Sequence, residues 1–210
     1  MNTYHKIETV YKRELDGNRN IIEGQYSIPE FEMLKDITWV WTEKIDGTNI
    51  RIMPDKDVIR FGGKTDRAQI PTPLLDVLQD TFTLDNMQNV FKGETDICLY
   101  GEGYGKKIQK GGNYIPDGNN FILFDIRVGK WWLTRETCED IAEQLEIPIV
   151  PIINEGTLLE AVEYVKVGFK STIAHNTDYE AEGLVMKPKY DLFARNGKRI
   201  ISKIKHTDFK

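Results

Sequence analysis

Short stretches in which apolar residues alternate with polar ones predict several β-strands. Residues 38–42 are aromatic and β-branched, residues 49–53 alternate isoleucine with polar side chains, and residues 58–61 form another short apolar run. Residues 1–36 show no sustained period, apart from a short helix at 28–34 with proline in its first turn. The first strand that the pattern predicts is therefore the one at 38–42.

Two longer apolar runs each carry an acidic residue. Residues 96–102 end at Glu102, and residues 103–107 are expected to follow as a loop. Residues 120–126 form a near-continuous apolar strand that contains Asp125. Because a buried carboxylate is unfavourable without a partner, Asp125 is expected to have one.

Apolar residues at helical spacing predict further helices. Residues 73–91 follow this pattern, with a break near 81–83. Thr134 has the position of an N-cap, and Thr157 begins a capping box that ends at Glu160. The apolar faces of these last two helices consist of Cys138, Ile141, Ala142 and Leu145, and of Leu158, Ala161, Val162 and Val165. Both helices are expected to be scaffold.

The composition, 40% hydrophobic and 29% charged over 210 residues, is that of a globular protein with a proper core. No run approaches the roughly 18 apolar residues of a membrane span, and the N-terminus lacks the apolar segment of a signal peptide. We therefore expect a cytoplasmic protein without membrane contact. Cys98 and Cys138 lie in apolar segments, so buried free thiols are expected.

The net charge of -5 argues against a protein that coats nucleic acid nonspecifically. The charge is unevenly placed, because residues 187–210 are locally basic. This segment carries Lys187, Lys189, Arg195, Lys198, Arg199, Lys203, Lys205 and Lys210 against Asp191 and Asp208. It also contains two predicted strands, at 183–187 and 198–205, and the second places Lys203 and Lys205 on one side. Such an end suits a polyphosphate or a nucleic-acid backbone, with a solvated basic tail as the alternative.

Lys44 begins the sequence Lys-Ile-Asp-Gly, between the strands expected at 38–42 and 49–53. A lysine on the flank of a tight strand-turn-strand is held in place, so its amine can be aimed at an electrophile. The tetrapeptide resembles the K-x-D-G signature of the covalent nucleotidyltransferases, which include polynucleotide ligases and mRNA capping enzymes. A solvated lysine before an Asp-Gly hairpin turn is the alternative.

Residues 62–65, Gly-Gly-Lys-Thr, have the letters that end a P-loop but are not one, because the required earlier glycine is Val58. The segment still offers backbone amides, Lys64 and Arg67 to a phosphate.

Five short sequences occur in one order and together are far more specific than any one of them. They are Lys-Ile-Asp-Gly at 44–47, Tyr-Gly-Glu at 100–102, Phe-Ile-Leu-Phe-Asp-Ile at 121–126, Glu-Gly-Leu-Val-Met-Lys at 182–187 and Lys-Ile-Lys at 203–205. This set resembles the motifs of ATP-dependent RNA ligases, most closely the phage-type RNA ligase 2 family, over residues 38–205.

The resemblance implies an α+β nucleotidyltransferase fold, in which antiparallel sheets enclose an ATP cleft and helices lie outside. It implies an RNA-repair enzyme that uses ATP and Mg²⁺ or Mn²⁺, adenylates itself, passes AMP to an RNA 5′-phosphate and seals that end to a 3′-hydroxyl. The expected partners are RNA ends or a nicked duplex, and the protein is expected to be a monomer.

The resemblance also implies residue roles. Lys44 would be the nucleophile that forms lysyl-AMP and releases pyrophosphate, and Lys203 and Lys205 would hold the α-phosphate. Glu182 would orient the water shell of the metal. The chemistry needs such a set, because an unassisted lysine is only about 0.04% neutral at pH 7. Nearby cations disfavour its protonated form and neutralise the charge that develops on the phosphate.

The remaining implied roles concern the nucleoside. Glu102 would hold the ribose hydroxyls, and Phe124 would stack on adenine with support from Asp125. Glu43 and Asn49 match positions that flank the nucleotide, although a capped turn or a surface carboxylate remains the alternative for each.

Two departures from the family pattern stand out. The position about twenty residues after the nucleophile, usually arginine, is Lys64, so Arg67 or Arg60 could have taken over its bidentate phosphate contact. The chain ends five residues after Lys205, so we expect residues 1–210 to be a single adenylation domain without a C-terminal OB or other accessory domain.

Other functions stay open at this point. A minimal DNA ligase or a GTP-using capping enzyme would carry similar motifs. A nucleic-acid-binding module that has lost catalysis is a further alternative, although such a module would need no nucleophile.

Overall fold

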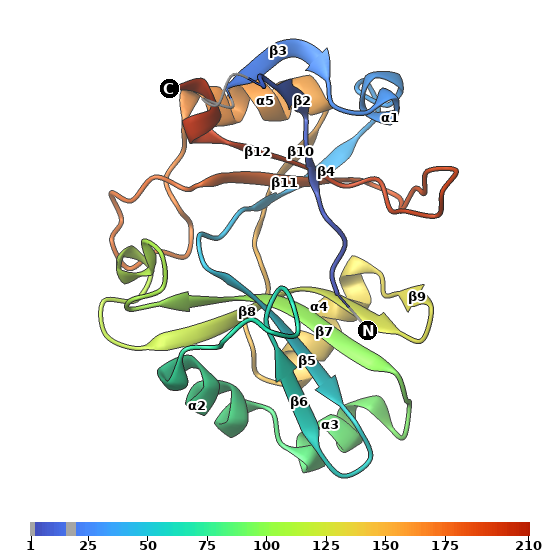
Figure 1. The fold of residues 1–210 in the computed structure, drawn as a ribbon, viewed down its shortest axis with the longest axis vertical. Coiled ribbons are helices and arrows are strands. Elements are labelled where there is room, and N and C mark those ends of the chain that lie inside the picture. Colours follow the sequence, from blue (N-terminus) through green and yellow to red (C-terminus); the bar gives the residue numbers. More distant parts are fainter. Residues whose placement is uncertain (1–2, 16–19) are drawn as a thin grey trace. The chain divides into compact units, whose positions relative to one another are not determined.

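The computed structural model describes residues 3–15 and 20–210, which form two compact units (Figure 1). Unit 1 contains residues 3–4, 46–150 and 174–176, and unit 2 contains the other described residues. The chain passes from unit 2 into unit 1 between Ile45 and Asp46.

Unit 1 is built on one antiparallel five-stranded sheet, with strand order β6-β5-β7-β8-β9. Its strands are β5 (Thr48–Pro54), β6 (Ile59–Gly62), β7 (Ile97–Gly105), β8 (Asn119–Val128) and β9 (Trp131–Trp132). Its helices are α2 (Thr72–Thr81), α3 (Leu84–Phe91), α4 (Arg135–Gln144) and the short 3-10 helix η1 (Gly111–Asn113).

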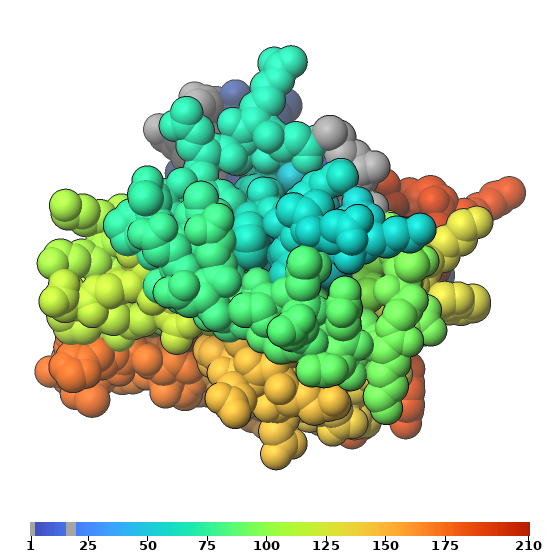
Figure 2. Space-filling view, turned by 90° about the horizontal axis from the view of Figure 1, so that it is seen from below, coloured from blue at the N-terminus to red at the C-terminus, as the bar shows by residue number. Residues whose placement is uncertain are grey.

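Helices α2, α3 and α4 cover one face of this sheet, and the core lies between them and the sheet. Leu74 and Leu78 of α2 and Ile141 of α4 pack in the same apolar cluster as Ile50 and Ile52 of β5. Figure 2 shows the helix-covered face, with α2 and α3 in teal to green and α4 in golden yellow. The alternate residues of β5, among them Asn49 and Arg51, therefore point to the opposite face of the sheet.

Unit 2 is built on a second five-stranded sheet, with strand order β1-β12-β11-β4-β10. Its strands are β1 (Glu8–Thr9), β4 (Trp39–Glu43), β10 (Ile152–Gly156), β11 (Gly183–Pro188) and β12 (Ser202–Lys205), and a separate pair consists of β2 (Tyr11–Arg13) and β3 (Ile21–Tyr26). Its helices are α1 (Pro29–Met33), α5 (Leu158–Val167) and the 3-10 helix η2 (His206–Phe209). Only β1 and β12 pair in parallel among the described strands; the other pairs are antiparallel.

The core of unit 2 consists of apolar side chains from α5, β4, β11 and β12. Trp39 and Trp41 alternate along β4 and pack with Val162 of α5. Ile204 of β12 belongs to the same cluster, which leaves Lys203 and Lys205 on the other face of that strand.

Most of the predicted elements are present. The strands expected at 38–42, 49–53 and 58–61 are β4, β5 and β6, with each boundary shifted by one residue. Residues 73–91 form α2 and α3, which are separated where the break was predicted.

The predicted caps are confirmed. The Thr134 hydroxyl accepts a hydrogen bond from the Thr137 backbone amide at 3.3 Å, and Thr157 forms a full capping box with Glu160. Cys98 and Cys138 are buried free thiols, as expected. Among the described residues, no helix is long and apolar enough to cross a membrane.

The prediction of a loop at 103–107 is wrong, because β7 continues to Gly105. The glycines of β7 provide space for neighbouring groups and do not form a turn. A Cβ at Gly101 would lie 2.2 Å from the Phe121 ring, and one at Gly103 would lie 2.3 Å from Leu74 of α2. Glycine in this strand therefore allows close packing, a use that the sequence pattern does not separate from a loop.

The N-terminal region also differs from the prediction. Three short strands, β1 to β3, lie within residues 1–36, where no strand was expected. At two to six residues, they are too short to show a clear alternation.

The strand expected at 198–205 begins only at Ser202.

Candidate active site

Lys44 follows the last residue of β4, and its position differs from the expected hairpin. β4 pairs with β10 and β11, whereas β5 pairs with β6 and β7, so residues 44–47 connect two different sheets. The Lys44 amide donates to the Gly183 carbonyl at 2.9 Å, which fixes the lysine backbone beside β11. Its side chain is 20% exposed, so Lys44 is not the solvated turn lysine of the alternative interpretation.

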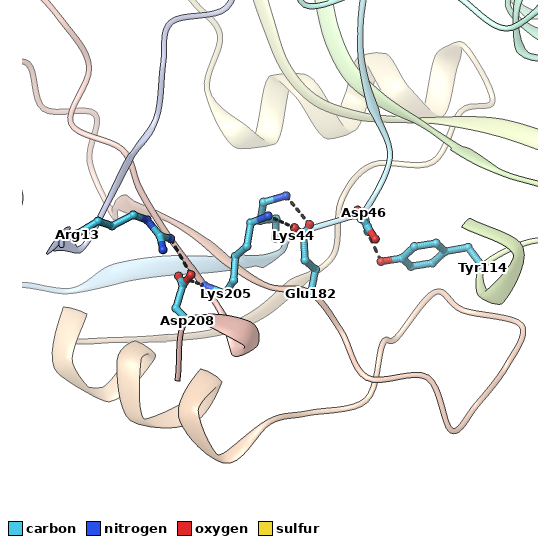
Figure 3. A network of polar contacts seen from close by, with 7 residues as sticks. All are labelled: Arg13, Lys44, Asp46, Tyr114, Glu182, Lys205 and Asp208. Carbon is cyan, nitrogen blue, oxygen red and sulfur yellow. Dashed lines mark hydrogen bonds and ion pairs between the residues drawn. The ribbon is translucent and has the colours of Figure 1, made fainter. Parts of the chain in front are cut away.

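Glu182 connects two lysines that are far apart in the sequence (Figure 3). One carboxylate oxygen accepts from Lys44 Nζ in a short ion pair, and the other accepts from Lys205 Nζ at 2.5 Å. The Glu182 side chain is only 12% exposed, so these charges are poorly screened. Two ammonium groups on one carboxylate leave this cluster with a net positive charge, which favours binding of a phosphate.

Gly183 allows this cluster to form. A Cβ at this position would lie 2.1 Å from the Ile204 carbonyl oxygen and 2.8 Å from the Lys205 Cα atom. Its φ of +153° is also unfavourable for other residues. Glycine directly after Glu182 therefore lets β12 approach closely enough for Lys205 to reach the carboxylate.

The end of β12 is held by contacts within unit 2. The Lys205 amide donates to Asp208 at 3.0 Å, and Asp208 also accepts from Arg13 at 2.6 Å (Figure 3). The His206 amide donates to the Glu182 carbonyl at 2.9 Å. Lys203 lies two residues before Lys205 and is half-buried. The strand therefore presents both lysines on one face, as the alternation predicted.

Glu43 is buried, with 1% of the residue exposed, and its carboxylate is fully engaged by the protein. It accepts from the hydroxyl of Ser171 in a short hydrogen bond, and from the amide and hydroxyl of Thr172, both at 2.9 Å. Glu43 therefore holds residues 171–172 next to the backbone that precedes Lys44.

Unit 1 carries the other predicted residues, on the sheet face opposite its helices. Asn49 of β5 lies directly across from Glu102 of β7, so their side chains are neighbours on one face. The Asn49 Oδ1 atom is buried and has no hydrogen-bond partner among the described residues. Gly47 gives this pair room, because a Cβ there would lie 2.3 Å from the Gly103 carbonyl oxygen and 2.8 Å from Glu102 Cγ. The glycine of the tetrapeptide is thus required by close packing.

Phe124 and Asp125 lie where β8 is interrupted by a bulge, with Asp125 opposite Tyr100. The expected partner of buried Asp125 is the Tyr4 hydroxyl, which donates a short hydrogen bond to it. The Tyr4 ring also packs edge-on against Phe124, with centroids 5.1 Å apart, and lies near Trp132. Burial raises the pKa of the Tyr100 phenol beside them, so this hydroxyl stays protonated at neutral pH.

Lys64 is exposed in the loop that follows β6, and buried Arg51 holds this loop. The Arg51 side chain is completely buried, and it donates to the Gly63 carbonyl at 2.7 Å and to Asp66 at 2.8 Å. The two candidates for the family's arginine differ in their contacts. Arg60 pairs with Asp55 at 3.1 Å, whereas Arg67 is exposed beside Lys64 in the loop.

The structure thus brings the predicted residues together in two groups. In unit 2, Lys44 and Lys205 contact Glu182, and Lys203 shares their strand face. In unit 1, Asn49 and Glu102 are cross-strand neighbours, as the register shows.

Sequence reasoning missed three residues that hold these groups: Tyr4, Arg51 and Ser171. For Tyr4 there was an indirect indication, since Asp125 was expected to need a partner. Tyr4 lies 121 residues from Asp125, however, and no local sequence pattern identifies it. The alternation at 49–53 does not indicate that Arg51 is buried.

The fold and the site define a mixed α/β protein of antiparallel sheets, with a carboxylate shared between two lysines. A family model described as RNA ligase matches residues 37–205. The match covers most of the chain, which therefore belongs to the RNA ligase family.

Solved structures of the RNA ligase of Naegleria gruberi have a similar fold. The structure with PPi gives a TM-score of 0.66 at 21% identity and covers 100% of this chain and 61% of that one. A point mutant with ATP and Mn gives 0.68 at 21% identity, covering 99% and 59%. A point mutant with AMP and Mn gives 0.65 at 21% identity, covering 97% and 57%. This chain therefore spans about three fifths of the length of those it matches.

Proposed function

We propose that this chain is an ATP-dependent RNA ligase that forms a covalent lysyl-AMP at Lys44. The Lys44–Glu182–Lys205 cluster is the observation that carries the proposal. It holds a candidate nucleophile in a fixed, partly buried position, and it places a second cation where a phosphate would need one.

In the first step, the neutral Lys44 amine attacks the α-phosphorus of ATP. The P–N bond forms, the bond to the β-phosphate oxygen breaks, and pyrophosphate leaves. The protonated ammonium that pairs with Glu182 has no lone pair, so it has to lose a proton before this attack. Lys203 and Lys205 stabilise the charge that develops on the α-phosphate oxygens.

Two further transfers complete the reaction. An oxygen of the RNA 5′-phosphate attacks the α-phosphorus of lysyl-AMP, which breaks the P–N bond and restores Lys44. The 3′-hydroxyl of a second RNA end then attacks the 5′-phosphate, and AMP leaves.

The sheet face of unit 1 supplies the nucleoside contacts of this proposal. Glu102 binds the ribose hydroxyls, and Asn49, whose Oδ1 has no partner in the part of the chain that the structure describes, offers an acceptor beside it. Phe124 stacks on adenine, and Tyr4 positions Phe124 through its ring contact and its bond to Asp125. Lys64 contacts a phosphate.

A divalent metal fits the proposal only as an ion shared with the nucleotide. Within residues 3–15 and 20–210, no three His, Cys, Asp or Glu side chains gather to hold a metal. Mg²⁺ commonly binds through one carboxylate, several waters and substrate phosphates, so Glu182 is sufficient to orient its water shell. The metal would neutralise phosphate charge. The N. gruberi ligase structures with ATP and Mn or AMP and Mn support the use of such an ion here.

The test is incubation of the protein with each labelled nucleoside triphosphate and Mg²⁺, followed by denaturing electrophoresis. We expect a labelled protein band with ATP alone. A band with GTP alone would replace the proposal by a capping-type transferase, and no band with any nucleotide would leave only a binding module. Sealing of labelled RNA ends, compared with DNA ends, then tests the substrate.

A further inference from the structure

The connection between β11 and β12 is an ordered hairpin of residues 189–199, which extends beyond the end of the sheet (Figure 1). Phe193 and Arg199 pair across it as an antiparallel bridge. The Ala194 amide donates to the Lys198 carbonyl at 2.8 Å, and the turn contains Gly197 with φ +78°. The hairpin therefore has a defined backbone conformation, held by its own hydrogen bonds.

One side of the 189–199 hairpin packs on unit 2, and the other presents aromatic rings to solvent. Leu192 and Ala194 pack against the core cluster of unit 2. Tyr190 and Phe193 are 79% and 55% exposed. Exposing rings of this size forgoes about 1.5–3 kcal/mol of burial for each, so folding does not account for their placement.

The charge of the 189–199 hairpin is positive on the exposed side. Arg195 and Lys198, in the same hairpin as the two rings, are exposed. The one acidic residue of the hairpin, Asp191, is neutralised by Arg199 at 3.1 Å. The surface thus combines free cations with exposed aromatic rings and carries no unpaired carboxylate of its own.

This combination is the chemistry of single-stranded nucleic-acid binding. Aromatic side chains stack on unpaired bases of any sequence, and nearby cations follow the phosphates. On the basis of the proposed function, we propose that the 189–199 hairpin is a contact surface for a single-stranded stretch of the RNA substrate. Tyr190 and Phe193 stack on bases, and Arg195 and Lys198 contact phosphates.

The position of the hairpin sets which part of the RNA it contacts. β11 connects Glu182, beside the nucleophile, to the start of the hairpin. At about 3.4 Å per residue, this strand places the hairpin roughly 20 Å from the lysine cluster. The hairpin therefore contacts RNA several nucleotides away from the reacting end.

The experiment measures binding of 5′-phosphorylated single-stranded RNA of 20 and of 3 nucleotides by fluorescence anisotropy at several salt concentrations. The variants are Tyr190→Leu with Phe193→Leu, which keeps apolar side chains but removes the rings, and Arg195→Ala with Lys198→Ala. The control is Lys12→Ala with Lys56→Ala, two exposed lysines outside the hairpin.

We expect the ring variant to bind the 20-mer about tenfold or more weakly, since stacking contributes about 1–3 kcal/mol per base. The charge variant should lower the salt slope by about 1.4, which is about 0.7 for each phosphate contact on a single strand. The control should match the wild type, and no variant should change binding of the 3-mer. Wild-type binding of the 20-mer by both hairpin variants would overturn the proposal, as would equal losses for the two RNA lengths.

Self-adenylation separates this proposal from the proposed function. Every variant should form the labelled adduct with ATP at the wild-type rate, because the hairpin does not touch the nucleotide. If wild-type protein forms no adduct yet the hairpin variants lose the 20-mer, the proposed function fails and the RNA surface stands. If adenylation is intact and RNA binding is unchanged in the variants, only the hairpin proposal fails.

Discussion

At the scale of single residues, the chemistry rests on how one carboxylate is shared. Lys44 and Lys205 lie 161 positions apart in the sequence and meet on Glu182. Each was recognisable from its sequence motif, but the shared contact was not, because it depends on the antiparallel pairing of β11 with both β4 and β12.

The two lysines of β12 should be needed for adenylation. Lys203→Ala and Lys205→Ala should each slow formation of lysyl-AMP by about 100-fold or more, as the loss of one group that stabilises developing charge commonly does. The rate of adduct formation with labelled ATP checks this, with exposed Lys56→Ala as the control. If both variants react at the normal rate, β12 does not line the site.

Lys64 and Arg67 are the two candidates for a phosphate contact in the proposed reaction. We expect Arg67→Ala to impair adenylation at least as much as Lys64→Ala, because only a guanidinium offers a planar bidentate contact. The comparison uses kcat/KM for ATP in both variants. An inactive Lys64→Ala together with an unaffected Arg67→Ala would assign the role to the lysine.

At the scale of elements, glycine and arginine explain where the sequence pattern was wrong. Gly103 was interpreted as the start of a loop, yet it lies inside β7, where Leu74 of α2 packs on it. Gly47 belongs to a recognised motif, but glycine is required there because a Cβ would clash with the backbone of β7. Periodicity identified the caps and strands well, since those depend on local residues. Packing between distant segments leaves no local pattern.

Arg51 provides a test of this long-range support. Arg51→Met should raise KM for ATP by about tenfold, equivalent to one charge-assisted contact of about 1.5 kcal/mol, because the loop that carries Lys64 loses its anchor. Adduct formation at saturating ATP should fall less. Arg135→Met, which removes an exposed ion pair on α4, is the control. A lower melting temperature with unchanged KM would show that Arg51 supports folding alone.

At the scale of the whole molecule, a chain of net charge -5 has a locally basic segment at 187–210, which includes Lys203, Lys205 and the 189–199 hairpin. Family membership follows from the match over residues 37–205, and five short sequences in one order were enough to predict it. The Asp125 partner was not predictable because Tyr4 lies 121 positions away, and the anchor of the Lys64 loop was not because it depends on how β5 and the loop after β6 pack within unit 1.

The steps of the reaction should differ in their sensitivity to salt. Self-adenylation should survive added salt better than sealing does, because ATP is small whereas RNA depends on several phosphate contacts. RNA with a preadenylated 5′ end should be joined more readily than RNA with a 5′-phosphate, since it bypasses both self-adenylation and the transfer of AMP to the RNA. Rates of the three steps, measured separately from low to moderate salt, check this. Equal rates and equal salt slopes for both RNA ends would contradict it.

The most direct measurement of the central claim is the intact mass of the protein after incubation with ATP and Mg²⁺, followed by peptide mapping. The account predicts one added AMP, located on Lys44, which is removed by pyrophosphate. Lys44→Arg, which keeps a cation beside Glu182, should carry none. An unmodified wild-type protein, or AMP on a different residue, would contradict the account.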